Sequence, residues 1–405
     1  MVFKQGNDSP PHLSPILHFN LEIKMPKRKL ISEMGLLNIL QLDKFAATGE
    51  EVDAKDLSFK YTVTIIANAG FGIDANALDG SPQGVQFLKM ARKVSGSDQT
   101  SWDIAKQLIT IMLPKFLMKL GPELINVGAV SFFNDIIDQT LKMRETQGTK
   151  SSSMVDLFSE TMMGEAADEE DIKKEVEKEL EGQTLAAPKK FTMEEMDTIM
   201  RGNLFALFLA GMELPAIMMS GCIYFLAKNQ DVQEKLSDEM KEANLDDNLD
   251  YNTVMNLPYL DMVVQEALRH SAFADGNWKC ARDYQVPGTN TTIPKGMHVT
   301  LSARGISMDE RFFPDPTAFN PENFTKKNKE SRPALAGSEI GFSIGPRKCI
   351  GNRFAILQFK TGIANMVNKF RILPTPRTPE KYEPDPNSGT FAVKGGNWVK
   401  FERRD

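Results

Sequence analysis

The sequence has few of the residues from which disulfide scaffolds and zinc sites are built. It has four histidines and three cysteines, Cys222, Cys280 and Cys349, in 405 residues. The cysteines lie far apart, and none belongs to a C-x-x-C pair or to a cluster of Cys and His. This excludes a disulfide scaffold and disfavours a zinc finger. A lone cysteine is most often an inert, buried small hydrophobe, so each one needs local evidence before it is given a role.

The sequence also lacks a surplus of positive charge. Its net charge is −6 and its pI is near 5.5, whereas a nucleic-acid binder carries a basic surplus. We therefore expect no nucleic-acid partner. The charged share of 25% and the hydrophobic share of 41% are ordinary for a globular protein. A chain of this length can bury a large core, as one big domain or as two smaller ones.

Long apolar runs are almost absent. Residues 1–30 hold prolines and scattered charge, with no signal peptide. One internal run, Asn203–Ala227, has the length of a membrane span, but Glu213 and Pro215 lie near its middle. An acidic residue at the bilayer centre costs about 2.5–3.5 kcal/mol. A helix that is apolar on all sides can equally be the central helix of a soluble core. Composition alone leaves both alternatives open.

Helical apolar spacing recurs along the chain, and turn-rich segments with β-branched residues lie in its C-terminal half. The Thr192–Glu195 sequence T-M-E-E predicts a capping box at a helix start. We expect helices over Asp53–Gly72, Gly84–Val94, Ile104–Lys119, Ala129–Thr146, Thr192–Lys228, Asp231–Ala243, Tyr259–His270 and Gly351–Phe370. Short strands are expected in Asp283–Thr300 and after Phe370, with irregular structure over Arg311–Phe324. The charged run Gly164–Gly182 predicts a solvated helix or a disordered loop, part of a surface connection over about residues 164–190.

One short segment carries the chemistry. Residues 342–351 read FSIGPRKCIG, directly before a predicted helix. Two cations, Arg347 and Lys348, and a helix N-terminus near the Cys349 sulfur would lower its pKa and favour the thiolate. No second Cys or His lies within reach along the sequence, so a soft metal held there would have to bring its own equatorial ligands. Haem does so, and thiolate is one of its axial ligands.

This segment resembles the haem-binding loop of the cytochrome P450 family, in which phenylalanine, glycine, arginine, cysteine and glycine stand at fixed spacing. The resemblance implies that Cys349 is the proximal iron ligand, that Phe342 packs on the sulfur and that Arg347 pairs with a haem propionate. The cofactor-binding residues that it implies are Phe342, Gly345, Arg347, Cys349, Gly351 and Ala355.

Two further motifs resemble the same family. Glu266 and Arg269 stand at i, i+3 on one helical face, and in the family such a pair is buried and organises the loop before the haem cysteine. Residues 208–213, FLAGME, look like the centre of the long helix that crosses the haem. There the family places Ala210 and Gly211 against the porphyrin and the acidic residue, Glu213, in proton delivery. The resemblance makes Asn203–Ala227 the central helix of a soluble domain.

The segments AGFGIDANAL (residues 69–78) and YFLAKNQDVQEKL (residues 224–236) look like insect or other arthropod members of the microsomal animal type. The resemblance implies a mainly α fold with a minor β portion, the cytochrome P450 fold. We expect a haem domain over residues 41–405 and an atypical segment over residues 1–40. The membrane anchor and first helices of the family are not recognisable there, so we interpret the chain as a truncated member.

Three positions depart from the family pattern. Leu214, followed by Pro215, stands where the family has a threonine that guides protons towards the haem, and a leucine cannot do acid–base work. Pro215 removes a donor to the Gly211 carbonyl and should kink the helix. Trp278 stands in place of an arginine that pairs with a propionate. Asn323, in PENF, stands in place of an arginine that completes the Glu266–Arg269 network, so we expect that network to be less well satisfied.

The resemblance implies a haem-thiolate monooxygenase that inserts one oxygen atom of dioxygen into a small apolar substrate. Two alternatives remain: a degenerate haem-binding member with little turnover, and a helical interaction protein without haem. The implied electron donor is an NADPH-dependent cytochrome P450 reductase, with cytochrome b5 as a second candidate. A basic surface from Arg347, Lys348, Arg353 and Lys360 could bind it; for Lys348 and Lys360 the alternative is a solvated surface charge. We expect a monomer. The family type is held on the endoplasmic reticulum membrane, and without a recognisable anchor the alternatives are peripheral attachment and a cytosolic location.

Overall fold

The fold was analysed in a computed structural model. It describes residues 3–4, 41–75, 77–78, 80–95, 127–147, 153–155, 192–245, 250–272, 275–332, 341–343, 348–385 and 392–404. The described helices are α3 (Ala54–Phe71), α4 (Pro82–Ser95), α6 (Val127–Gln147), α9 (Met193–Lys228), α10 (Gln230–Glu242), α11 (Tyr251–Met255), α12 (Pro258–His270), α13 (Ala303–Ser307), the 3-10 turn η2 (Pro321–Phe324), α14 (Lys326–Glu330) and α16 (Asn352–Lys369), and residues 41–48 are also helical. The strands are β1 (Phe3–Lys4), β2 (Val52–Asp53), β3 (Gly276–Cys280), β4 (Tyr284–Gln285), β5 (Thr292–Ile293), β6 (His298–Leu301), β7 (Phe370–Pro374) and β8 (Trp398–Arg403).

Local signals explain where the two central helices begin and end. The Asp53 carboxylate accepts from the Lys55 N–H at 2.9 Å at the start of α3, which ends at Gly72 with φ +68°. A left-handed residue at this position suits glycine. At the start of α9, Thr192 and Glu195 form the predicted capping box. The capping box at the start of α9 was predicted from the sequence, and the end of α3 agrees with the helix expected up to Gly72.

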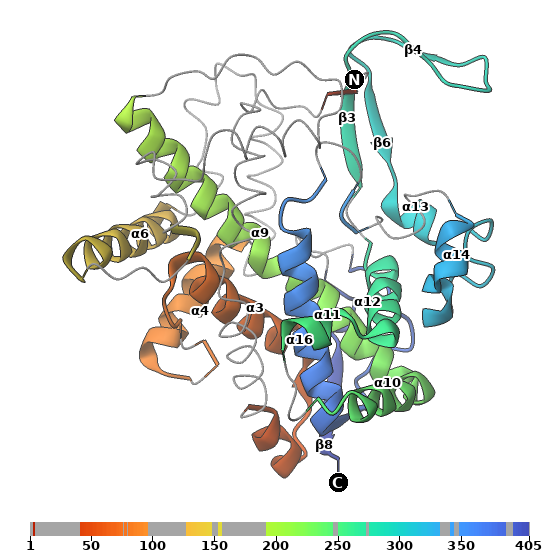
Figure 1. Cartoon of the computed structure of the whole chain (residues 1–405), viewed down its shortest axis with the longest axis horizontal. Helices are drawn as coiled ribbons and strands as arrows, with labels where there is room; N and C mark the ends of the chain where they lie inside the picture. The colour runs from red at the N-terminus through yellow and green to blue at the C-terminus, as the bar shows by residue number, and fades with distance from the viewer. Residues whose placement is uncertain are drawn as a thin grey trace.

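The long helix α9 organises the fold, as Figure 1 shows by its diagonal course through the molecule. It contacts α3 along its length and also α4, α6, α10, α12 and α16. Its first half belongs to an apolar cluster with α3, α4 and α6, and its second half to a cluster with α10, α12, α16, β7 and β8. Each large apolar side chain buried there stabilises the fold by roughly 1.5–3 kcal/mol.

The β portion is small and antiparallel in the described part of the chain. The strand orders are β1-β3-β6, β2-β8-β7 and β4-β5. In the first sheet Phe3 pairs with Cys280 and Lys4 with Lys279, so residues 3–4 of the segment expected to be atypical lie on β3. The predicted mainly α fold with minor strands is confirmed. The helix expected at Ile104–Lys119, the charged segment 164–190 and most of residues 1–40 lie outside the described residues.

One stretch of α9, Asp197–Lys228, is long and apolar enough to cross a membrane by length and composition. More than half of its most apolar window is buried inside the protein, and α9 contacts helices on several sides. These contacts agree with its interpretation as a central core helix.

Candidate haem-binding site

Cys349 lies just before α16 and is exposed to solvent, whereas Cys222 and Cys280 are buried. Its backbone N–H donates to the Phe342 carbonyl at 2.8 Å, which closes the loop between them. Gly351 follows as the N-cap of α16, and its carbonyl accepts from the Ala355 N–H at 2.8 Å. The cysteine therefore stands at a helix start, as the sequence predicted.

The pKa of the Cys349 thiol is raised above its ordinary value, because neighbouring protein atoms desolvate the thiolate even though the residue is exposed. The backbone N–H of Gly351, which hydrogen-bonds to the sulfur, acts in the opposite direction. The expectation of a lowered pKa is therefore wrong for the protein without its cofactor. Arg347, one of the two cations that supported it, lies outside the described residues.

The remaining loop residues are only partly described. Phe342 is half-buried and packs against the cluster built on the second half of α9. Ala355 is half-buried in the first turn of α16. Gly345 and Arg347 lie outside the described residues. The roles assigned to these residues at a haem remain predictions.

The predicted distal residues lie on two faces of α9. Ala206 and Ala210 are exposed, and Leu214 is 40% exposed, so these residues at i, i+4 and i+8 form an apolar stripe open to solvent. Gly211 lies on the face of α9 that packs against α3, where a Cβ atom would be 2.7 Å from the Ile66 side chain. Close packing against α3 therefore requires glycine at 211. The contact of Ala210 and Gly211 with a porphyrin stays a prediction.

Pro215 lies inside α9, which is nevertheless assigned as one helix from Met193 to Lys228. The buried Thr62 hydroxyl of α3 donates to the Met212 carbonyl at 2.8 Å. Pro215 deprives the Gly211 carbonyl of its helical donor, and the Thr62 hydroxyl binds the carbonyl of the next residue, Met212. The two helices are thus joined by a polar contact at the proline.

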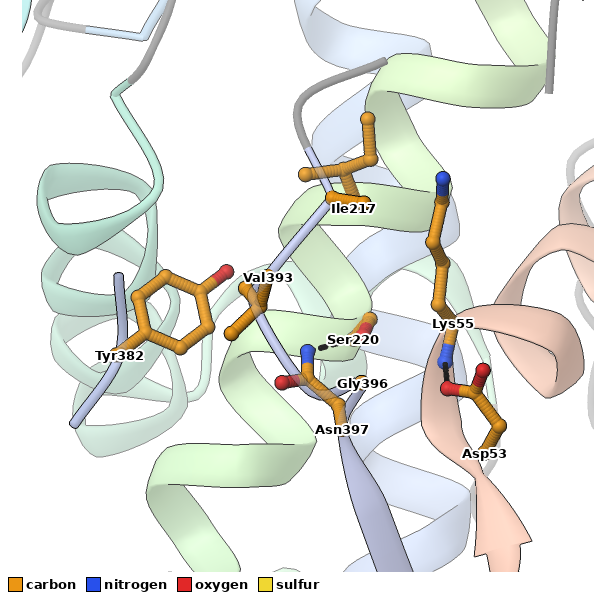
Figure 2. Close-up of a pocket in the computed structure, with 9 residues that line it drawn as sticks. Asp53, Lys55, Ile217, Ser220, Tyr382, Val393, Gly396 and Asn397 are labelled. Atoms are coloured by element: carbon orange, nitrogen blue, oxygen red, sulfur yellow. Dashed lines mark hydrogen bonds between the residues drawn. The ribbon is translucent and has the colours of Figure 1, made fainter. Parts of the chain in front are cut away.

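Glu213 is buried, and its carboxylate pairs with the Lys55 ammonium at 2.9 Å. Lys55 also lines a cavity of about 80 Å³ together with Asp53, Ser220 and Asn397. Figure 2 shows Asn397 hydrogen-bonded to Ser220, with Tyr382 on one side and Asp53 and Lys55 on the other. The Asn397 Oδ1 is buried and has no hydrogen-bond partner among the described residues. A cavity of this size that has several polar groups in its lining can hold water.

The predicted Glu266–Arg269 pair is formed and fully buried. Arg269 donates to Glu266 through Nε at 2.8 Å and Nη2 at 2.7 Å. Its Nη1 reaches the carbonyls of Ser307 and Pro316, both at 2.8 Å. Desolvation has the largest single effect on Glu266 and opposes its charge, but the hydrogen bonds and charges of Arg269 and His270 together outweigh it, so the pKa of Glu266 is lowered. The pair thus ties α12 to the irregular segment after α13.

The expectation that Asn323 leaves this network poorly satisfied is wrong. The Asn323 Nδ2 donates to Glu266 Oε1 at 3.3 Å, and the Asn320 N–H donates to the same oxygen at 2.8 Å. The carboxylate therefore receives two further donors besides Arg269, both from η2 and its N-cap. The other substituted residue, Trp278, is half-buried on β3, and its ring covers Gly276.

Lys360 does not contribute to a basic surface, contrary to the sequence-based prediction. It is 2% exposed, pairs with Asp261 at 2.7 Å and donates to the Met255 carbonyl at 3.1 Å. Arg353 and Lys348 are exposed. Sequence reasoning also missed Lys55 and Thr62. Their contacts with Glu213 and Met212 join α3 to α9 across more than a hundred residues of chain. No local sequence motif indicates pairs so far apart.

These residues fit a haem. An exposed thiol at a helix start can supply an axial ligand, and the open apolar stripe on α9 suits a porphyrin face. Figure 1 shows the start of α16 next to the middle of α9, and Phe354 in the first turn of α16 packs against both apolar clusters. In the described ranges no group of three or more His, Cys, Asp or Glu side chains could hold a metal ion. Cys349 thus has no cluster of protein co-ligands among the described residues, as expected of a thiolate that binds haem iron.

Comparison with known proteins agrees with this geometry. The family model "Cytochrome P450" matches residues 12–397. Cytochrome P450 6B7 of Helicoverpa armigera is 32% identical over 88% of this chain and 66% of its own length. Cytochrome P450 6B1 of Papilio polyxenes is 30% identical over 93% of this chain and 71% of its own, and cytochrome P450 9e2 of Blattella germanica is 29% identical over 87% and 64%. The chain spans about two thirds of the length of the curated relatives it matches, and these relatives are insect proteins, as the two arthropod-like segments predicted. The chain belongs to the cytochrome P450 family.

Proposed function

We propose that this protein is a haem-thiolate monooxygenase that acts on a small apolar substrate, with Cys349 as the axial ligand. One oxygen atom of dioxygen enters a C–H bond of the substrate, and the other leaves as water with two protons and two electrons. When bound, the haem supplies dioxygen activation, and an axial thiolate favours O–O cleavage. The observation that carries the proposal is the exposed Cys349 at the start of α16, in a chain whose family is shown.

The chain prepares the sulfur for a metal in two ways. The hydrogen bond between the Cys349 N–H and the Phe342 carbonyl fixes the loop, and the Gly351 N–H directed at the sulfur stabilises negative charge there. Desolvation keeps the free thiol protonated, so cofactor binding would release its proton. Metal binding to a thiol generally releases a proton in this way.

Glu213 is the residue that we assign to proton supply. Glu213 is ion-paired with Lys55, and Lys55 is one of the residues that line the cavity with Asp53, Ser220 and Asn397. Water in that cavity would give protons a route from α3 to the middle of α9. Replacing Lys55 with methionine should slow product formation more than it weakens haem retention, because Lys55 orients Glu213 and lines the cavity without being assigned to the cofactor.

A second candidate function, haem binding with little turnover, is favoured by Leu214. This side chain is exposed on the same stripe as Ala210, and it has no hydroxyl to move a proton further. Leu214→Thr would place a hydroxyl on that stripe. If the missing hydroxyl limits turnover, the variant should couple more of the consumed NADPH to product. Unchanged coupling would contradict this reasoning.

The proposed electron donor is an NADPH-dependent flavoprotein reductase. Arg353 and Lys348 are exposed close to Cys349 and suit an acidic partner, whereas the buried Lys360 does not. Arg353→Glu should slow reduction mainly at low salt, since exposed charges act on association rate and are screened by ions. We also propose attachment to the endoplasmic reticulum membrane, as in the family type, which cell fractionation of the expressed chain would test.

The decisive experiment is the carbon monoxide difference spectrum of the reduced protein, with Cys349→Ser and Cys280→Ser compared in parallel. A red-shifted Soret band of thiolate type should appear in the parent and in Cys280→Ser, and it should be lost in Cys349→Ser. A histidine-type band, or the same spectrum in the Cys349 variant, would reject Cys349 as the ligand. A parent protein without any band would favour the haem-free interaction protein.

A further inference from the structure

The Glu266–Arg269 network has a neighbour that no sequence motif suggested. Arg332 follows α14 and is the last described residue before the stretch that leads to Gly341 and Phe342. Its Nη1 donates to the Asn323 carbonyl at 2.6 Å, and its Nη2 lies 3.5 Å from Asn323 Oδ1. Arg332 is therefore bound to the residue that stands where the family has an arginine.

Asn323 is oriented as a bridge between opposite charges. Its Nδ2 donates to the Glu266 carboxylate at 3.3 Å, while both of its oxygen atoms face the Arg332 guanidinium. The donor end of the amide thus meets the anion and the acceptor end meets the cation. Asn323 is 8% exposed, so this alignment acts where water screens little.

The same guanidinium is held by an aromatic ring. The Cζ of Arg332 lies 4.4 Å from the ring centroid of Phe313, and the Cζ of Arg269 lies 4.7 Å from it. Phe313 is fully buried, so two arginines contact one desolvated ring. Glu266 attracts Arg332 electrostatically and Arg269 repels it, while partial burial lowers the pKa of the guanidinium. Arg332 is thus electrostatically part of the network without a direct ion pair to Glu266.

We infer that Arg332 is the third cation of this network, acting through Asn323 in place of an arginine at position 323. Its role is positioning. Glu266 of α12 binds Asn323, which in turn binds Arg332, and Leu268 of the same helix lies against Gly341, where a Cβ atom would sit 3.6 Å from the leucine side chain. The segment that leads to the Cys349 loop is therefore fastened to α12 at both ends. Its effect on that loop rests on the haem binding proposed above.

The test returns the positive charge from position 332 to position 323. The parent protein is compared with Arg332→Gln, Asn323→Arg, and the double variant Asn323→Arg/Arg332→Gln. Arg311→Gln is the matched control, because Arg311 is 81% exposed on the same part of the chain. Two quantities are measured: the haem retained per protein, from the Soret absorbance, and the equilibrium constant of urea unfolding for the haem-free protein.

We expect Arg332→Gln to reduce the folding equilibrium constant by roughly tenfold, the equivalent of one hydrogen bond to a charged group, and to retain less haem than the Arg311 control. Asn323→Arg alone should also destabilise, because it sets a second cation beside Arg332. The double variant should recover most of both losses. Asn323→Arg should thus destabilise the parent but stabilise the Arg332→Gln protein. A merely structural contact at Arg332 would not produce this reversal.

Any of three results would overturn the inference. They are an Arg332→Gln protein that matches the Arg311 control in both quantities, a double variant no better than Arg332→Gln, and an Asn323→Arg protein more stable than the parent. If the parent retains no haem, the proposed function fails, but the unfolding measurements on the haem-free chain still decide the role of Arg332.

Discussion

Substitution of Arg269 by lysine isolates the contribution of the guanidinium shape from that of its charge. Both Arg269 and Glu266 have 0% exposed side chains, so no water replaces a lost partner. Arg269 donates to two carboxylate oxygens and reaches the carbonyls of Ser307, Pro316 and Ala318 at 2.8–3.1 Å. Lysine has three donors on one nitrogen, so at least two of these five acceptors lose the donor that Arg269 supplies.

Hydrogen bonds that involve a charged group contribute about 1.5–3 kcal/mol each. Arg269→Lys should therefore lower the free energy of unfolding by about 3–6 kcal/mol, a large part of the 5–15 kcal/mol typical of a folded domain. Urea unfolding followed by tryptophan fluorescence would measure it. The control is Arg353→Lys on α16, which is exposed and should change the free energy by less than about 0.5 kcal/mol. A loss below about 1 kcal/mol in Arg269→Lys would refute the idea that donor geometry at this pair stabilises the fold.

Three further outcomes follow from single contacts. Thr62→Val removes the hydroxyl that donates to the Met212 carbonyl and should cost about 1–2 kcal/mol in urea unfolding, whereas Thr62→Ser should cost less; equal losses would contradict a role for the hydroxyl. Lys360→Met leaves Asp261 without its buried cation. Because Asp261 is 35% exposed, we expect the free energy of unfolding to fall by about 1–3 kcal/mol, less than the 3–5 kcal/mol of a fully buried pair. A higher melting temperature would contradict this expectation. Burial lowers the pKa of His270 below its ordinary value of 6.5, so the unfolded chain takes up a proton first and stability should fall as the pH drops below about 6.5. In His270→Gln this part of the pH dependence should flatten, and an unchanged slope in melting temperature between pH 7 and pH 5 would exclude His270 as its source.

Much of the fold could be predicted because its signals are local. The Thr192 capping box, the glycine after α3 and the proline at the start of α12 mark helix ends within a few residues of chain. The segment around Cys349 was equally readable, since its fixed residue types lie within ten positions. These features depend on neighbours in sequence; the structure reproduces the helix ends and the position of Cys349 before α16, whereas Gly345 and Arg347 lie outside the described residues.

What could not be predicted depends on contacts between distant segments. Lys360 looks like a surface lysine on an amphipathic helix, and only its packing beside Asp261 of α12 shows that it is buried. In the sequence, Asn323 indicates the loss of a positive charge, and only its contact with Arg332 shows that a cation lies beside it. The pKa of Cys349 is set by the atoms that exclude water from its sulfur, and no linear pattern encodes that exclusion.

The position of α9 in both clusters also has a consequence for how this protein unfolds. The single helix α9 contributes side chains to both hydrophobic clusters, and the Thr62 hydrogen bond attaches it to α3 near Pro215. If α9 unfolds, both clusters therefore lose part of their packing together. Heating should consequently melt both halves in a single cooperative step, with no stable half-molecule along the way.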